Sequence, residues 1–298
     1  MSEAARAREI IAALPPEERA RLTARADAAG LRHLALYLGA IALCSCWIAL
    51  RLPLWPVVLL PQGLLLTFLF TLEHECTHET PFASGRLALW VGRASGLVIL
   101  LPFTWFRAFH MAHHRWTNLP GKDPELAVPK PEGARAMLLH YTGLPYWAGQ
   151  IALLARLSAG RADDSFLPPR LAAKAIREAR VMVAVYAVAL ASLALIPALF
   201  WLWILPLILT QPALRAYLLA EHGDCPEVAE MLENTRTTFT TKAVRFLAWN
   251  MPYHTEHHAW PQVPFHRLPE VHAAFREHLK VTAPGYAAFT RGYLARHR

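Results

Sequence analysis

Three long stretches without a charged residue place the strongest constraint on how this chain can fold. Val181–Leu214 has 34 consecutive uncharged residues, while Leu34–Leu50 and Leu52–Leu72 have 17 and 21 and are separated only by Arg51. A transmembrane helix needs roughly 20 apolar residues to cross about 30 Å of hydrocarbon. One straight helix of 34 residues would be about 50 Å long, which is too long for a single crossing. These stretches therefore predict membrane-spanning helices, and the longest stretch predicts two.

Proline, arginine and tryptophan mark the turns that we expect between these crossings. The first hairpin is predicted to turn near Arg51–Pro56, and the second at Pro197, which is followed by the interface-favouring Trp201 and Trp203. Four crossings in two hairpins leave both chain ends on one side of the membrane. Because lysine and arginine gather outside the two proposed outer turns, the positive-inside rule places both termini and the polar portions in the cytoplasm.

One further apolar segment, Leu87–Phe106, does not fit a crossing. Arg93 lies inside it, and its uncharged part from Ala94 covers only 13 residues, fewer than a span requires. We expect this segment to be re-entrant or to lie in the membrane interface.

The pattern as a whole predicts one all-α integral membrane domain over residues 1–298, with a helical cytoplasmic cap. Residues 1–32 are charged and arginine-rich and lack the apolar core of a signal peptide, so they are predicted to form cytoplasmic or interfacial helices. The remaining expected parts are a first hairpin at 33–72, a cap segment at 73–180 that includes the re-entrant piece 87–106, a second hairpin at 181–219 and a second cap segment at 220–298.

Composition narrows the partners of such a protein. The chain is 55% hydrophobic and 17% charged, with a formal net charge of +8. Together with the apolar runs, this basic balance favours anionic lipid headgroups or an acidic protein partner over nucleic acid. The four cysteines have neither zinc-ribbon nor CxxC spacing, so we expect reduced thiols.

Histidines are concentrated in four places that the predicted topology brings to one face of the membrane. Nine of the 15 histidines belong to these places: His74 and His78 in "HECTH", His110, His113 and His114 in "HMAHH", the single His222, and His254, His257 and His258 in "HTEHH". Neutral imidazole binds iron, zinc, copper and nickel. Nine ligands are too many for one ion, so two ions sharing them fit the number. Iron would supply redox chemistry, although the ligand set alone leaves zinc and copper open.

The order H-x3-H, H-x2-HH, single His, H-x2-HH resembles the membrane fatty acid desaturase/hydroxylase superfamily, which also includes alkane hydroxylases and carotenoid ketolases and hydroxylases. The likeness runs from about Leu34 to about His272 and is closest to bacterial fatty acid desaturases. Flanking text agrees, with "HHRWTN", "NTRTT" at Asn234–Thr238, and "WNMPYHTEHHAWPQVPFHRLP".

This resemblance implies a diiron centre with all nine of these histidines as ligands and O2 as co-substrate. It implies removal of hydrogen from an unactivated C–H bond of a fatty acid or acyl lipid, and loss of a second hydrogen then gives a cis double bond. It also implies an integral protein of the bacterial cytoplasmic membrane. Because the chain has no CxxC iron–sulfur pattern and no dinucleotide-binding glycine motif, an external ferredoxin-like or cytochrome-b5-like donor is expected.

Other functions compete with this one. Within the superfamily, a hydroxylase or ketolase would act on an alkyl, sphingolipid or carotenoid substrate. "HECTH" also matches HExxH, in which Glu75 would be the general base of a membrane zinc protease, but that function leaves both H-x2-HH groups unexplained. A metal transporter would place polar groups within its spans, and the apolar runs lack acidic residues and histidines.

Several further polar residues are candidates for supporting roles. Glu221, Glu256 and Asn250, four residues before His254 on a possible helix, are predicted to orient metal ligands, although capping or solvation would also explain them. Asp123 and Glu125 in a Pro-rich loop are predicted to form a solvated turn. The remaining histidines are predicted to be non-ligands: His33, His140, His266, His272, His278 and His297.

Overall fold

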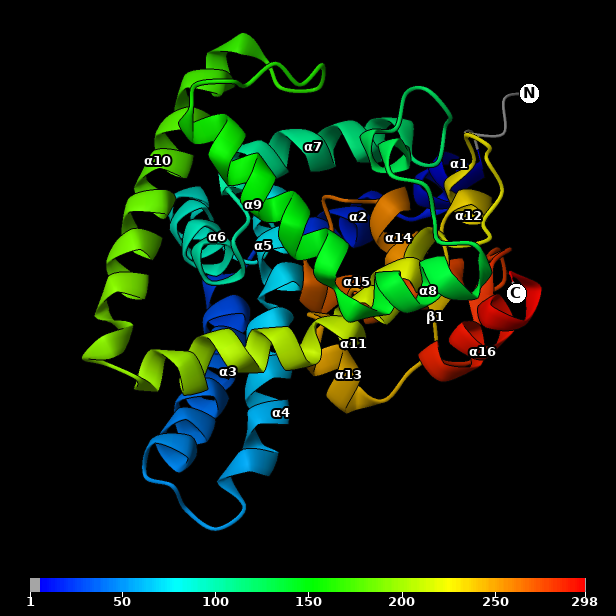
Figure 1. Cartoon of the computed structure of the whole chain (residues 1–298). Helices are drawn as coiled ribbons and strands as arrows, with labels where there is room; N and C mark the ends of the chain where they lie inside the picture. The colour runs from blue at the N-terminus through cyan, green and yellow to red at the C-terminus, as the bar shows by residue number, and fades with distance from the viewer. Residues whose placement is uncertain (1–5, 298) are drawn as a thin grey trace.

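The computed structural model describes residues 6–297, and helices make up nearly all of its regular structure (Figure 1). The first half of the chain contains α1 Arg6–Ala13, α2 Pro16–Thr23, α3 Asp27–Ala49, α4 Trp55–Thr67, α5 Leu69–Thr77, α6 Gly85–Ile99, α7 Phe103–Trp116, η2 Pro124–Ala127, α8 Gly133–Thr142 and α9 Leu144–Ser158. The second half contains α10 Pro169–Ala191, η3 Ser192–Ala194, η4 Phe200–Ile204, α11 Leu205–His222, α12 Met231–Asn234, β1 Thr237–Thr238, α13 Lys242–Leu247, α14 His254–Ala259, η5 Phe265–Arg267, α15 Leu268–Phe275, β2 Thr282–Ala283 and α16 Tyr286–Arg296. Within residues 6–297 the strands are limited to β1 and β2, which form one short parallel pair. The predicted helical class is therefore confirmed apart from this pair.

The first apolar region forms the expected hairpin. Helices α3 and α4 lie side by side in the lower part of Figure 1, and residues 50–54 connect them. The turn uses left-handed backbone at Arg51 and Leu54. The Arg51 guanidinium lies 4.4 Å from the ring centre of Trp55 and 5.5 Å from that of Trp201. Arg51 therefore links the turn of the first hairpin to the π-helical segment η4.

By length and composition, three helical segments among the described residues can cross a membrane: Pro16–Ala49, Trp55–Thr77 and Phe200–His222. The number rises to four if the bent pair α6 and α7 is counted as one span. Helix α10, in which we expect the first crossing of the second hairpin, is not among the three. Its first half carries Arg170, Lys174, Arg177, Glu178 and Arg180, and α10 begins 12 residues before Val181. The arrangement of four crossings beneath a cap stays a prediction.

The second apolar region breaks where Pro197 predicts. Helix α10 continues through η3 to residue 194, and the chain then turns before η4 and α11 (Figure 1). Helix α11 packs directly on α4, because Gly63 leaves room for its backbone: a Cβ atom at Gly63 would lie 2.2 Å from the Pro206 carbonyl oxygen. Four residues later, the Thr67 and Thr210 hydroxyls are 2.7 Å apart. Since both contacts advance together along the two helices, α4 and α11 run in the same direction where they pack.

The segment that we expect to be re-entrant contains a sharp bend. Helices α6 and α7 meet at an angle of 101°, and Leu100 between them has left-handed backbone. Side chains satisfy carbonyls at the end of α6: Tyr186 Oη donates to Leu97 O at 2.6 Å, and Trp203 Nε1 donates to Val98 O at 2.8 Å. A bend of this kind is the geometry of a re-entrant segment or of a broken crossing.

Candidate metal centre

The four histidine groups meet at one place. His74 lies in the last turn of α5 and His78 caps that helix, while α7 carries the second group near its C-terminal end. His222 is the last residue of α11, and the third multi-histidine group forms α14. His74 and His78 lie at the end of the candidate span Trp55–Thr77, and His222 ends the span Phe200–His222, so both candidate spans end at this same site.

The imidazoles divide into two sets. Within each set one nitrogen per ring lies within 4.8 Å of the others; set A is His74, His78, His110, His114 and His257, and set B is His113, His222 and His258. His254 belongs to neither group by this distance, but its Nε2 lies 3.1 Å from His222 Nε2, which places it beside set B. The structure therefore brings all nine histidines together, as two neighbouring groups.

The spacing between nitrogens fits a shared ion. His78 Nε2 and His110 Nε2 are 2.8 Å apart in set A, and His113 Nε2 and His222 Nε2 are 3.2 Å apart in set B. Imidazole nitrogens bound at about 2.1 Å to one ion lie about 3 Å from each other. Among the described residues, both ring nitrogens of His74, His114 and His257 and Nε2 of His258 are buried without a hydrogen-bond partner. Such orphaned nitrogens are costly unless something binds them, so the donor set fits two metal ions.

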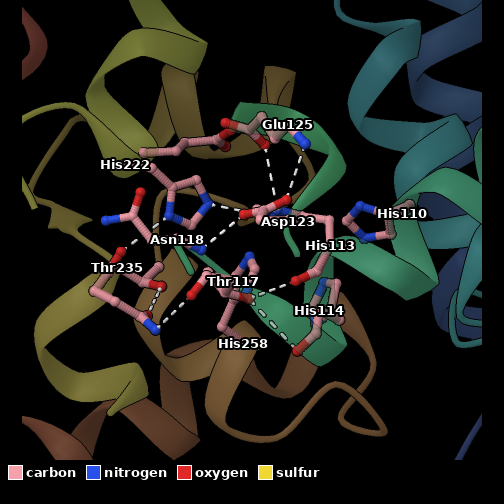
Figure 2. A network of polar contacts seen from close by, with 12 residues as sticks. His110, His113, His114, Thr117, Asn118, Asp123, Glu125, His222, Thr235 and His258 are labelled. Atoms are coloured by element: carbon pink, nitrogen blue, oxygen red, sulfur yellow. Dashed lines mark hydrogen bonds and ion pairs between the residues drawn. The ribbon is translucent and has the colours of Figure 1, made fainter. Parts of the chain in front are cut away.

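Asp123 orients the first imidazole of set B. Figure 2 shows its carboxylate beside His113, with Oδ1 and Oδ2 each 3.0 Å from His113 Nδ1. The same carboxylate accepts from the backbone N–H groups of Asn118 at 2.7 Å and Glu125 at 2.9 Å. Burial acts to raise the pKa of Asp123. Its hydrogen bonds with His113, Glu125 and Asn118 together lower the pKa by more, so the net pKa lies below the usual value. An ionised Asp123 holds the proton on His113 Nδ1 and leaves Nε2 facing His222.

Two uncharged groups orient other members of set B in the same way. The Thr117 hydroxyl donates to the His113 carbonyl at 2.8 Å and so accepts from His258 Nδ1 at 3.1 Å. His222 Nδ1 donates to the Asn234 carbonyl at 3.1 Å. In each ring the Nδ1 position is satisfied by the protein, and Nε2 is free for an ion.

Among residues 6–297, set A has no comparable hydrogen-bonded braces. His257 and His74 pack against each other and their neighbours through ring contacts, with centroids 4.7 Å apart. The two sets touch where His114 of set A stacks on His258 of set B, with ring centroids 4.0 Å apart and planes within 4°. Burial lowers the pKa of both His257 and His258 well below the usual value. Both imidazoles are therefore neutral at physiological pH, which is the metal-binding form.

The three predicted orienting residues lie in different surroundings. Glu221 Oε1 is 3.5 Å from His254 Nδ1, so Glu221 faces a histidine of the cluster. Asn250 instead donates to the Phe265 carbonyl at 3.0 Å, and buried Glu256 accepts from Thr237 Oγ1 at 2.5 Å and contacts His272 Nδ1. Neither is hydrogen-bonded to any of the nine histidines within residues 6–297. The six other histidines belong to neither set.

The helical premise for Asn250 is wrong. Trp249 and Asn250 both have left-handed backbone, and α14 begins only at His254. The i to i+4 relation that would place Asn250 beside His254 therefore does not exist.

Glu75 of the HExxH match points away from the histidines. Its Oε1 accepts from the Phe265 backbone N–H at 2.7 Å, and its Oε2 accepts from Thr80 Oγ1 at 2.6 Å. Glu75 is fully buried. With both oxygens engaged, it connects the end of α5 to η5.

The expectation of a solvated turn at Asp123 is wrong, because this side chain is buried against His113. Glu125 is only partly buried: its side chain is 40% exposed, and its Oε2 lies 3.5 Å from His113 Nδ1. Sequence reasoning also missed Thr117 and Asn234, although both lie in the segments "HHRWTN" and "NTRTT". Asn234 Nδ2 donates to the Thr117 carbonyl at 3.1 Å, so these two segments brace each other.

The sequence of this chain is similar to those of known fatty acid desaturases. The family model described as fatty acid desaturase matches residues 49–290. An omega-6 fatty acid desaturase of Glycine max is 32% identical over 110 residues, 36% of this chain and 27% of that protein. An sn-1 oleoyl-lipid 12-desaturase of Picosynechococcus is 28% identical over 38% of this chain and 36% of its own length. An sn-1 acyl-lipid omega-3 desaturase (ferredoxin) of Synechocystis is 28% identical over 45% of this chain and 38% of its own length. The aligned regions thus span well under half of each of these relatives.

Proposed function

This chain belongs to the fatty acid desaturase family, and on that basis we propose that it is a membrane-bound, O2-dependent diiron desaturase that introduces a cis double bond into the alkyl chain of an acyl lipid. The observation that carries the proposal is the pair of imidazole sets: in each set one nitrogen per ring lies within 4.8 Å of the others, and among the described residues His74, His114, His257 and His258 have buried ring nitrogens without a hydrogen-bond partner. All nine histidines are assigned as iron ligands. Iron bound there supplies the redox power to oxidise an unactivated C–H bond with O2.

The residues of the chain would hold this centre and control its surroundings. Asp123, Thr117 and the Asn234 carbonyl keep protons on Nδ1 of three imidazoles, so their Nε2 lone pairs remain directed inward. Phe106 stacks on His110 with ring centroids 5.6 Å apart, which places an apolar surface beside set A. Apolar surroundings exclude water from an oxidising site.

The site's position favours a chain-bearing substrate from the membrane. It lies where the candidate spans Trp55–Thr77 and Phe200–His222 end, and we propose that this end faces the cytoplasm of a bacterial inner membrane. Electrons would come from an external donor, ferredoxin-like or cytochrome-b5-like. One relative is named with ferredoxin, and an acidic donor would complement the basic charge of this chain.

Mass spectrometry of lipids from cells that express the protein tests the reaction type. Desaturation predicts acyl chains that are two hydrogens lighter, in amounts that disappear with the His257→Ala variant. A gain of one oxygen instead would identify a hydroxylase of the same superfamily, and unchanged lipids together with normal iron loading would contradict both.

Glu75→Gln distinguishes the desaturase from an HExxH zinc protease. In this structure glutamine can still accept from the Phe265 N–H, while Thr80 can turn its hydroxyl to the Glu75 backbone carbonyl, 3.2 Å away. We expect iron content to be retained and turnover to change by less than about fivefold, since about one hydrogen bond is rearranged. Loss of a general base would instead cost about 10²–10⁴-fold.

The measurement is turnover per folded, metal-loaded chain, with His78→Ala as the comparison variant. His78→Ala should lose metal and activity together. A collapse of activity in Glu75→Gln with full metal content would favour the protease chemistry.

A further inference from the structure

A concave site lies outside the metal centre. It is a groove of about 1470 Å³ between α6, α7 and the first half of α10. In Figure 1, α10 runs along one side of the molecule, and α6 and α7 lie beside it. The part of the groove nearer the apolar half of α10 is lined by Leu97, Val181 and Met182, while Trp90 and Phe166 add apolar surface elsewhere.

The groove and the histidines use opposite faces of α7. Arg107, Ala108, Met111 and Arg115 line the groove, whereas the histidines of α7 point into sets A and B. The body of this helix therefore separates the groove from the metal ligands. An occupant of the groove would be distinct from a chain held at the reacting centre.

Positive charge dominates the groove's polar side. Its lining includes one carboxylate, that of Glu178. It also includes seven cationic side chains: Arg93, Arg107, Arg115, Lys122, Arg170, Lys174 and Arg177. Glu178 is engaged with Arg93 at 3.3 Å and with the Thr104 N–H at 2.8 Å. Arg107 pairs with Glu79 at 2.7 Å. Within residues 6–297, the other five cations have no ion-pair partner.

The five unpaired cations lie on two sides of the groove. Arg170, Lys174 and Arg177 stand at i, i+4 and i+7 and so share one face of α10, and all three are exposed and line the groove. Across the groove, Arg115 and Lys122 lie 5.0 and 4.7 Å from the ring centre of Trp116. Five like charges around one hollow repel one another unless an anion lies between them.

Helix α10 changes from cationic to apolar along its length. Arg170, Lys174 and Arg177 occupy its first half, and the uncharged run that we expect to enter the membrane begins at Val181. A ligand that follows this gradient has an anionic head and an apolar chain. Basic pockets beside membrane helices bind phosphate-bearing lipid headgroups in this way.

We propose that this groove binds an anionic glycerophospholipid, with its phosphate between the α10 cations and Arg115 and an acyl chain along Leu97, Val181 and Met182. The lipid is a resident ligand that seats α6 and α10 at the membrane surface. This site does not depend on the reaction assigned to the metal centre.

Native mass spectrometry of the delipidated full-length protein in detergent tests the proposal. The probes are dioleoylphosphatidylglycerol, dioleoylphosphatidylcholine and inorganic phosphate as competitor. We expect phosphatidylglycerol to bind at least about tenfold more tightly than phosphatidylcholine, because several cations contact its headgroup. The triple variant Arg170→Gln/Lys174→Gln/Arg177→Gln should lose this preference.

A matched control removes the same charge elsewhere. Arg135, Lys242 and Arg291 are exposed and outside the groove, so changing all three to glutamine should leave the preference intact. Ala94→Phe, which fills the apolar lining without altering charge, should weaken binding of both lipids. Equal affinity for the two lipids in the unmodified protein, equal losses in the two triple variants, or full displacement by millimolar inorganic phosphate would each overturn the proposal.

Discussion

Replacing His257 with alanine is expected to remove one of two irons from the protein and to lower turnover by more than about 100-fold. His257 is fully buried in set A, and neither of its ring nitrogens has a hydrogen-bond partner among the described residues. Removing it takes one of five nitrogens from that set. Loss of a group that merely supports a metal ligand costs about 10–100-fold, so loss of the ligand itself should exceed that range.

Iron per chain, measured by plasma mass spectrometry on purified protein, checks this prediction independently of activity. The matching change in set B is His222→Ala, which should also leave about one iron. His33→Gln is the control, because His33 is half-buried and bonded to the Phe246 carbonyl at 3.0 Å, away from both sets. Two irons in His257→Ala, with unchanged turnover, would refute the assignment.

Asp123→Asn is expected to produce the second-largest effect, a loss of about 10–100-fold in iron affinity or turnover. The Asn118 N–H bonds to Oδ2 and the Glu125 N–H to Oδ1, so asparagine keeps an oxygen for only one of these groups and presents its amide N–H to the other and toward His113 Nδ1. The imidazole must then give up its Nδ1 proton or turn away, and either change disturbs the nitrogen that faces His222 at 3.2 Å. Because the pKa of Asp123 is lowered, the carboxylate stays charged throughout the neutral range, and the loss should not depend on pH there.

Glu125→Gln supplies a matched comparison on the same imidazole. Glu125 Oε2 is 3.5 Å from His113 Nδ1, but its side chain is 40% exposed, and exposed ion pairs contribute little. We expect a change of less than about threefold in iron titrations. If Glu125→Gln and Asp123→Asn behaved alike, the role given to the buried carboxylate would be wrong.

The apolar runs and the histidine spacings predicted much of what the structure contains. The turn at Arg51, the break at Pro197 and the convergence of nine imidazoles follow from residues that are informative by themselves. The start of α10 could not be predicted from the apolar pattern, however, because the first half of this helix is cationic. The division of the histidines into two sets also required the structure, since it depends on how four helices rotate toward a common point.

The bracing residues were harder to predict for physical reasons. Asp123 follows His113 by ten residues in a Pro-rich loop, a composition typical of solvated turns. It reaches His113 because Asn118 has left-handed backbone, and the loop folds back so that the Asn118 N–H meets the Asp123 carboxylate. For Asn250 the error was the opposite one, because the sequence suggested a role at the metal centre that the structure does not support. Trp249 and Asn250 are two successive residues with left-handed backbone, and they interrupt the helix that would have placed Asn250 beside His254.

Both H-x2-HH helices contribute to both sets, and this links the two metal positions mechanically. On α7, His110 and His114 serve set A and His113 serves set B; on α14, His257 serves set A and His258 serves set B. Successive residues on a helix differ by about 100° in direction, so turning α7 enough to tighten one set would loosen the other. An ion of unsuitable radius in one position would therefore be felt at its neighbour, and the pair would accept or reject a foreign metal as a unit.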